Sequence, residues 1–179
     1  MSNLKKLIFI IETINSKVGD TTAWLVLLMT LTAFLVSVLR YFFNIGYVWM
    51  QESYVWMHGV IFLFGAGYTL LTDQHVRVDI FYRLTNERGR AIINLVFSIF
   101  LLLPFIFVIT KYSIPYVLKS WYSFETSREA GGLSFLYLYK TTLILFCFFL
   151  LIQTISLILR CILVLLKKEK KIFFKFLNK

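Results

Sequence analysis

Residues 49–82 read WMQESYVWMHGVIFLFGAGYTLLTDQHVRVDIFY, and this stretch decides the fold. Its first two thirds are apolar enough for a membrane-spanning helix, yet they carry an acid, Glu52, and an imidazole, His58. The charged connection that follows carries further ionisable residues, among them His75, Arg77 and Asp79. Because ionisable side chains near hydrocarbon are costly and rare, these residues are candidate functional positions.

Three further apolar runs of helical length accompany this stretch. The expected spans cover about residues 22–43, 48–71, 91–114 and 141–166. Hydrophobic residues make up 59% of the chain, above the roughly 45–50% of soluble domains. Since the runs show no alternation of polar and apolar residues, a membrane β-barrel is excluded. The sequence predicts an all-α integral membrane protein with four transmembrane helices.

Two segments flank the four-helix membrane domain, which is expected over residues 20–166. Apolar residues recur at helical spacing near the N-terminus, so residues 1–19 are predicted to form an amphipathic helix in the membrane interface. The alternative is that this segment is a polar extension of the first span. The basic tail, residues 167–179, is expected to contact anionic lipid headgroups.

The longest external connection is expected over residues 116–140, between spans 3 and 4. It is rich in Trp, Tyr and Phe, which is typical of chain at headgroup depth, so an amphipathic surface segment is predicted. Gly131-Gly132 is expected to form its turn. Pro104 is predicted to kink span 3, because it removes a backbone donor, and Pro115 to mark the outer end of that span.

The positive charge predicts an orientation in the membrane. The net charge is +10, and fourteen of the 19 Lys and Arg residues lie in the N-terminal segment, the second connection and the C-terminal segment. With four spans these segments share one side, so the positive-inside rule places both termini in the cytoplasm. The charge is therefore attributed to topology and lipid headgroups, and no nucleic-acid partner is expected.

Glu52 admits two interpretations. It lies within about two turns of the outer end of its span, on one stripe with Trp49 and Trp56. One interpretation is a proton or cation site; the favoured one is an interfacial anchor or an ion pair that faces a partner. His58 lies about 9 Å further along the axis and about 120° around the helix, so no proton relay with Glu52 is expected. His58 is predicted instead to hydrogen-bond to a neighbouring helix.

The rest of the 49–82 stretch predicts packing and a structured connection. The small residues Gly65, Ala66 and Gly67 would let another helix backbone approach closely. Residues 75–80 alternate polar and apolar side chains, as an extended segment would, but they can equally be the start of a helix, in which Asp79 and Arg83 would form an i, i+4 pair. Because no nucleophile or phosphate-loop motif is present, no enzyme activity, cofactor or metal is expected. Haem would need a second well-placed imidazole, and the other one lies in a connection.

Two segments carry a more specific pattern. Residues 49–82 contain E-x3-W-M-H-G, F-L-F-G-A-G-Y-T-L and D-x-H-V-R-V-D-I-F-Y. Residues 123–153 contain Glu125-Thr126-Ser127, Gly131-Gly132-Leu133, Lys140 and Leu150-Leu151-Ile152-Gln153. Together they resemble the small membrane (Q) subunit of TRAP transporters, the tripartite ATP-independent periplasmic transporters. The family often has proline after Gly-Gly-Leu, where this chain has Ser134.

The resemblance implies a non-catalytic small permease subunit, a scaffold for a large membrane subunit. It implies a sodium-coupled importer of organic anions, carboxylates and most closely 2-oxo acids, in a bacterial inner membrane. The implied partners are the large membrane subunit, a transient periplasmic binding protein and membrane lipids. The alternatives are a self-sufficient proton-coupled transporter that uses Glu52, and a haem- or quinone-binding redox subunit. The residues assigned to subunit contact or structure are Glu52, Trp56, His58, Gly65, Gly67, Asp73, His75, Arg77, Asp79, Glu125, Gly131, Gly132, Lys140 and Gln153.

Overall fold

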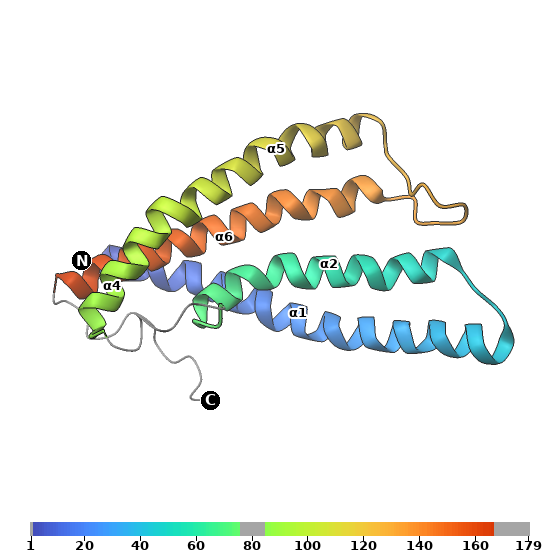
Figure 1. The fold of residues 1–179 in the computed structure, drawn as a ribbon, viewed down its shortest axis with the longest axis horizontal. Helices are drawn as coiled ribbons and strands as arrows, with labels where there is room; N and C mark the ends of the chain where they lie inside the picture. Colours follow the sequence, from blue (N-terminus) through green and yellow to red (C-terminus); the bar gives the residue numbers. More distant parts are fainter. Residues whose placement is uncertain (1, 76–84, 167–179) are drawn as a thin grey trace.

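Four long helical segments make up the computed structural model of the chain (Figure 1). The structure describes residues 2–75 and 85–166. The predicted all-α architecture with four apolar helices long enough to cross a membrane is confirmed. One segment consists of α4, a π-helical turn and α5, which run on without a break. The bounds are α1 Ser2–Phe43, α2 Val48–Leu71, α4 Glu87–Phe97, the π-helical turn Ser98–Leu102, α5 Leu103–Tyr122 and α6 Leu136–Leu165.

Helix α6 is the centre of the arrangement. It lies between the α1–α2 pair and α5 in Figure 1 and contacts α1, α2, α4 and α5. Its buried residues, such as Leu157 and Cys161, pack with Ala91 of α4 and Ile106 of α5. We call the end with the connections 44–47 and 123–135 the loop end. The opposite end, where α1 begins and α6 ends, is called the terminal end.

Helix α1 is one continuous helix of 42 residues, about 63 Å long. Because a hydrocarbon core is only about 30 Å thick, α1 extends well beyond the length of a single span. The segment predicted as a separate interfacial helix has no boundary with the rest of α1, which agrees with the alternative of a continuous extension. Its polar residues Glu12 and Asn15 are buried against α6 rather than facing outward.

The two prolines have different effects on the third span. Pro104 is the second residue of α5 and follows the π-helical turn. Because proline has no N–H, the wider hydrogen-bond pattern of a π turn lets the helix continue past it. The helix itself does not end at Pro115, since α5 continues to Tyr122, and the outer end of the membrane span at Pro115 stays a prediction. A membrane helix tolerates one missing donor, and the connection to α6 is therefore residues 123–135 rather than 116–140.

Candidate functional site

Glu52 holds the 123–135 connection against the start of α2. Its carboxylate accepts a hydrogen bond from the Leu133 backbone N–H at 2.6 Å and another from the Ser127 hydroxyl. The Ser127 N–H in turn donates to the Leu133 carbonyl at 3.0 Å. One carboxylate therefore binds two residues of the connection that are also hydrogen-bonded to each other. We call Glu52, Ser127 and Leu133 the loop clamp.

The predicted turn at Gly131-Gly132 is confirmed. Gly131 has φ 79°, in the left-handed region, and the Gly132 N–H donates to the Glu129 carbonyl at 3.0 Å. A Cβ on Gly132 would lie 2.5 Å from Ser127 Oγ and 2.7 Å from Glu52 Oε2. Residue 132 must lack a side chain because the carboxylate occupies that space.

A second contact ties the same connection to α6. Lys140 Nζ forms an ion pair with the Glu125 carboxylate and lies 4.2 Å from the ring centroid of Tyr116. The hydrogen bond from Lys140 holds the pKa of Glu125 below its usual range. Glu125, Lys140 and Tyr116 also help to line a pocket of about 360 Å³ between α2, α5 and α6.

Trp56 packs between α2 and α6. Its ring stacks on Tyr139, with centroids 5.0 Å apart and an interplanar angle of 10°. Gly59, one turn further along α2, makes room for the Tyr139 hydroxyl, which a Cβ would meet at 2.0 Å. The three residues of the predicted stripe therefore have different surroundings. Trp49 is 48% exposed, whereas Glu52 contacts the loop and Trp56 contacts α6.

A buried polar cluster joins α1 to α6 towards the terminal end, and Gln153 is the one member that the sequence had singled out. Glu12 forms a two-point ion pair with Arg160 and accepts a hydrogen bond from the Ser156 hydroxyl at 3.1 Å. Asn15 Nδ2 donates to Gln153 Oε1 at 3.1 Å. Glu12 and Asn15 are 1% and 0% exposed, so these groups depend on one another rather than on solvent. Charges of opposite sign that interrupt two apolar runs, Glu12 and Arg160, are the sequence signal for this cluster.

Gly67 fits against this cluster. A Cβ on Gly67 would lie 2.3 Å from Asn15 Oδ1 and 3.4 Å from the Phe149 carbonyl oxygen. The close packing predicted for Gly65-Ala66-Gly67 is therefore present at Gly67. Gly65 differs, because no atom lies within 4 Å of a Cβ built there, so it takes no part in packing within the described chain.

His58 is exposed on α2. Within residues 2–75 and 85–166 its ring makes neither a hydrogen bond nor an ion pair. The prediction that His58 hydrogen-bonds to a neighbouring helix is therefore not met by the described helices. The reason is rotational position: Trp56 and Gly59 face Tyr139 of α6, and His58 lies about 160° around the helix from Trp56.

The start of the second connection folds back onto α2. His75 Nε2 lies 3.1 Å from Thr69 Oγ1 and 3.2 Å from the Ala66 carbonyl oxygen. Asp73 has φ 60°, a left-handed conformation that reverses the chain after the helix. The remaining residues predicted here, Arg77 and Asp79, lie outside the described residues.

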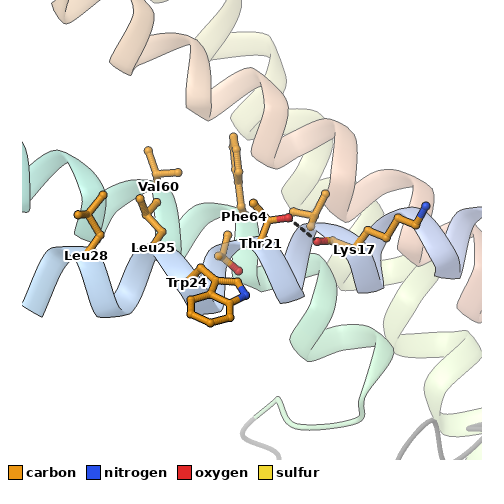
Figure 2. A pocket seen from close by; sticks show the side chains of 9 residues that line it. Lys17, Thr21, Trp24, Leu25, Leu28, Val60 and Phe64 are labelled. Carbon is orange, nitrogen blue, oxygen red and sulfur yellow. Dashed lines mark hydrogen bonds between the residues drawn. The ribbon is translucent and has the colours of Figure 1, made fainter.

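An open groove of about 550 Å³ runs between α1 and α2 (Figure 2). The Thr21 hydroxyl donates to the Lys17 backbone carbonyl at 2.9 Å, so this polar group is satisfied by its own helix. The walls are formed mainly by apolar side chains, Trp24, Leu28 and Phe64 among them. Such a surface can hold a lipid acyl chain in a bilayer.

The described residues contain no group of three His, Cys, Asp or Glu side chains that could hold a metal ion.

The clamp, the Glu125–Lys140 pair and Arg160 all fall within one recognisable family pattern. The family model for the DctQ component of tripartite ATP-independent periplasmic transporters matches residues 29–163. The chain belongs to this family. No curated protein and no solved structure matches the chain.

Membership in the DctQ family confirms the resemblance seen in the sequence. As a small membrane component of a TRAP transporter, the chain works in an assembly with a large membrane subunit and a binding protein. The match begins within α1, after Glu12 and Asn15, and ends within α6, just after Arg160. The α1 residues of the buried polar cluster therefore precede the matched range, whereas its α6 residues lie inside it.

Proposed function

We propose that this DctQ component is a non-catalytic scaffold for the large membrane subunit of a sodium-coupled importer of organic anions. The proposed substrates are carboxylates, 2-oxo acids among them, which a periplasmic binding protein delivers. The observation that carries this proposal is the role of two carboxylates inside the fold. Glu12 is paired with Arg160, and Glu52 accepts the Leu133 N–H. A transport site needs a carboxylate that can bind and release its ion, whereas these two hold the chain together.

The proposed location is the bacterial inner membrane, with both termini in the cytoplasm. The support is the distribution of Lys and Arg, fourteen of 19 of which lie in the N-terminal segment, the second connection and the C-terminal segment. In this orientation the loop end faces the periplasm. The loop clamp and the Glu125–Lys140 pair then fix a surface that the binding protein meets transiently, while the basic tail contacts anionic lipids.

The connection after α2 is proposed to serve assembly with the large subunit at the cytoplasmic side. Support comes from His75, which is held against Thr69 and Ala66 and so fixes where the connection begins. Alanine at Arg77 or Asp79 should lower recovery of the complex more than it lowers substrate affinity. Normal assembly with altered substrate affinity would contradict this role.

The alternative function is a self-sufficient proton-coupled transporter that uses Glu52. Glu52→Gln separates the two proposals, because glutamine keeps a carbonyl acceptor for the Leu133 N–H but cannot bind and release a proton. A scaffold subunit predicts that the assembled transporter still takes up substrate; the alternative predicts that uptake stops. Glu129→Gln is the matched control, since Glu129 is an exposed carboxylate on the same loop.

Copurification tests the scaffold role. The tagged chain and the large membrane subunit, expressed together and extracted in mild detergent, should be recovered as a complex of fixed stoichiometry. Full stability and activity of the large subunit in the absence of this chain would overturn the scaffold role.

A further inference from the structure

The exposed face of α2 carries a seam suited to a second helix. Gln51, Val55, His58, Phe62 and Gly65 follow one another at alternating steps of four and three residues, and we call them the His58 face. This spacing averages 3.5 residues, the repeat of helices that pack lengthwise with a left-handed crossing. Val55 and Phe62 are 51% and 73% exposed, so the described chain does not cover the seam.

His58 lies near the middle of this helix. It is ten residues from Val48, about 15 Å along a helix of 24 residues and about 36 Å. That position is deep within a hydrocarbon core about 30 Å thick. Lipid chains offer no hydrogen-bond partner, and an imidazole is too short to reach the headgroups as a lysine can. A polar side chain of another protein would satisfy the ring.

The exposed faces of α1 and α6 have a different composition. On α1 the hydroxyls of Thr30 and Ser37 each donate to a carbonyl of their own helix at 2.9 Å. Along the middle of α6 the exposed large side chains are apolar: Leu145, Phe148, Leu151 and Ile155. These hydroxyls are satisfied by their own helix and the exposed middle of α6 is apolar, so these stretches are suited to lipid. The His58 face is not.

Gly65 provides the second feature of a helix-packing surface. It lies two turns from His58 on the same face, and within residues 2–75 and 85–166 no atom lies within 4 Å of a Cβ built on it. A small residue on an exposed membrane helix lets a second backbone approach closely, which favours association where the hydrophobic effect does not.

We propose that the His58 face binds a transmembrane helix of the large membrane subunit. A polar side chain of that helix hydrogen-bonds to His58, and its backbone passes close to Gly65. This inference rests on the proposed function, which supplies the large subunit, and it adds the face through which the two subunits meet.

Photo-crosslinking in the intact complex tests this assignment. Benzoylphenylalanine placed at position 58 should crosslink to the co-expressed large subunit. The matched control is the same probe at Phe34, which is 68% exposed on α1 and lies nine residues from the loop end of its helix. The adduct at position 58 should exceed that at position 34 by at least about tenfold. Equal adducts at both positions, or none at position 58 in a complex that copurifies, would overturn the inference.

A packing substitution tests the same face independently. A Cβ at position 65 has no atom of the described chain within 4 Å, so the isolated Gly65→Leu subunit should fold, while recovery of the large subunit should fall by at least about tenfold. Ile155→Phe, on the exposed face of α6, is the control and should leave recovery unchanged. Unchanged recovery with Gly65→Leu would contradict the proposal. If the wild-type chain does not copurify with the large subunit at all, the proposed function fails, and this inference with it.

Discussion

Glu52 accepts the backbone N–H of Leu133 at 2.6 Å, across 81 residues of sequence. One carboxylate at the start of α2 thereby sets the position of the connection between α5 and α6. The same loop is tied to α6 by the Glu125–Lys140 pair. The loop end is consequently held at two points, and its exposed surface has a defined shape without help from another protein.

Removing the Glu52 carboxylate should release this loop. Glu52→Ala leaves the Leu133 N–H and the Ser127 hydroxyl without their acceptor, at a cost of about 1–3 kcal/mol. Hydrogen exchange at the Leu133 amide, measured in detergent or nanodiscs, should accelerate by about tenfold or more. Glu129→Ala is the control, because its side chain is exposed and its backbone carbonyl is retained. Unchanged exchange in Glu52→Ala would mean that the clamp does not hold the loop.

The ion pair between Glu12 and Arg160 should dominate the attachment of α1 to α6. Glu12→Ala leaves a buried guanidinium without its carboxylate, so the free energy of unfolding should fall by about 3–5 kcal/mol. The double substitution Glu12→Leu with Arg160→Met should recover most of this loss, since an apolar pair removes the buried charge that has lost Glu12. Denaturant titration of the purified subunit measures both. A loss below about 0.5 kcal/mol for Glu12→Ala would show that the pair contributes little.

The two glycines of the small-residue patch should behave in opposite ways in the isolated subunit. Gly67→Ala places a Cβ 2.3 Å from Asn15 Oδ1, inside the buried cluster, and should destabilise by about 1–3 kcal/mol. The Cβ of Gly65→Ala meets no atom of the described residues, so this change should be neutral or stabilise by up to about 1 kcal/mol through helix propensity. Thermal unfolding, followed for both variants under the same conditions, gives the two Tm values to compare. Equal Tm values would mean that α1 does not pack at Gly67 as described.

The Glu125–Lys140 pair should make stability depend on pH. Lys140 lowers the pKa of Glu125 below its ordinary value of 4.5, so the pair stabilises the fold above that value. The stabilisation is lost as the pH falls through the lower pKa of the folded state. The Tm of the wild-type chain should exceed that of Glu125→Gln at pH 6 to 7, and the two should converge at acidic pH. The control Glu129→Gln should track the wild type, and a constant difference at every pH would exclude this role of Glu125.

The sequence alone predicts where the helices lie, but it does not predict which residues of different segments contact one another. Long apolar runs predict spans because hydropathy and helix length are local properties, and the ends of α2 agree with that prediction. The roles of Glu12 and Glu52 could not be derived in the same way. Each carboxylate is bound by residues more than 70 positions away, and a single sequence does not reveal which distant donor meets which acceptor. The position of Pro115 inside α5 shows a further limit, since a proline ends a helix only where its missing hydrogen bond is not tolerated.

Reconstituted uptake tests the central claim most directly. Proteoliposomes that contain the large membrane subunit and this chain, supplied with the binding protein, a sodium gradient and a labelled organic anion, should accumulate the anion. Omitting this chain should abolish or strongly reduce accumulation, and this chain alone should give none. Robust uptake by this chain alone would contradict its assignment as a scaffold subunit.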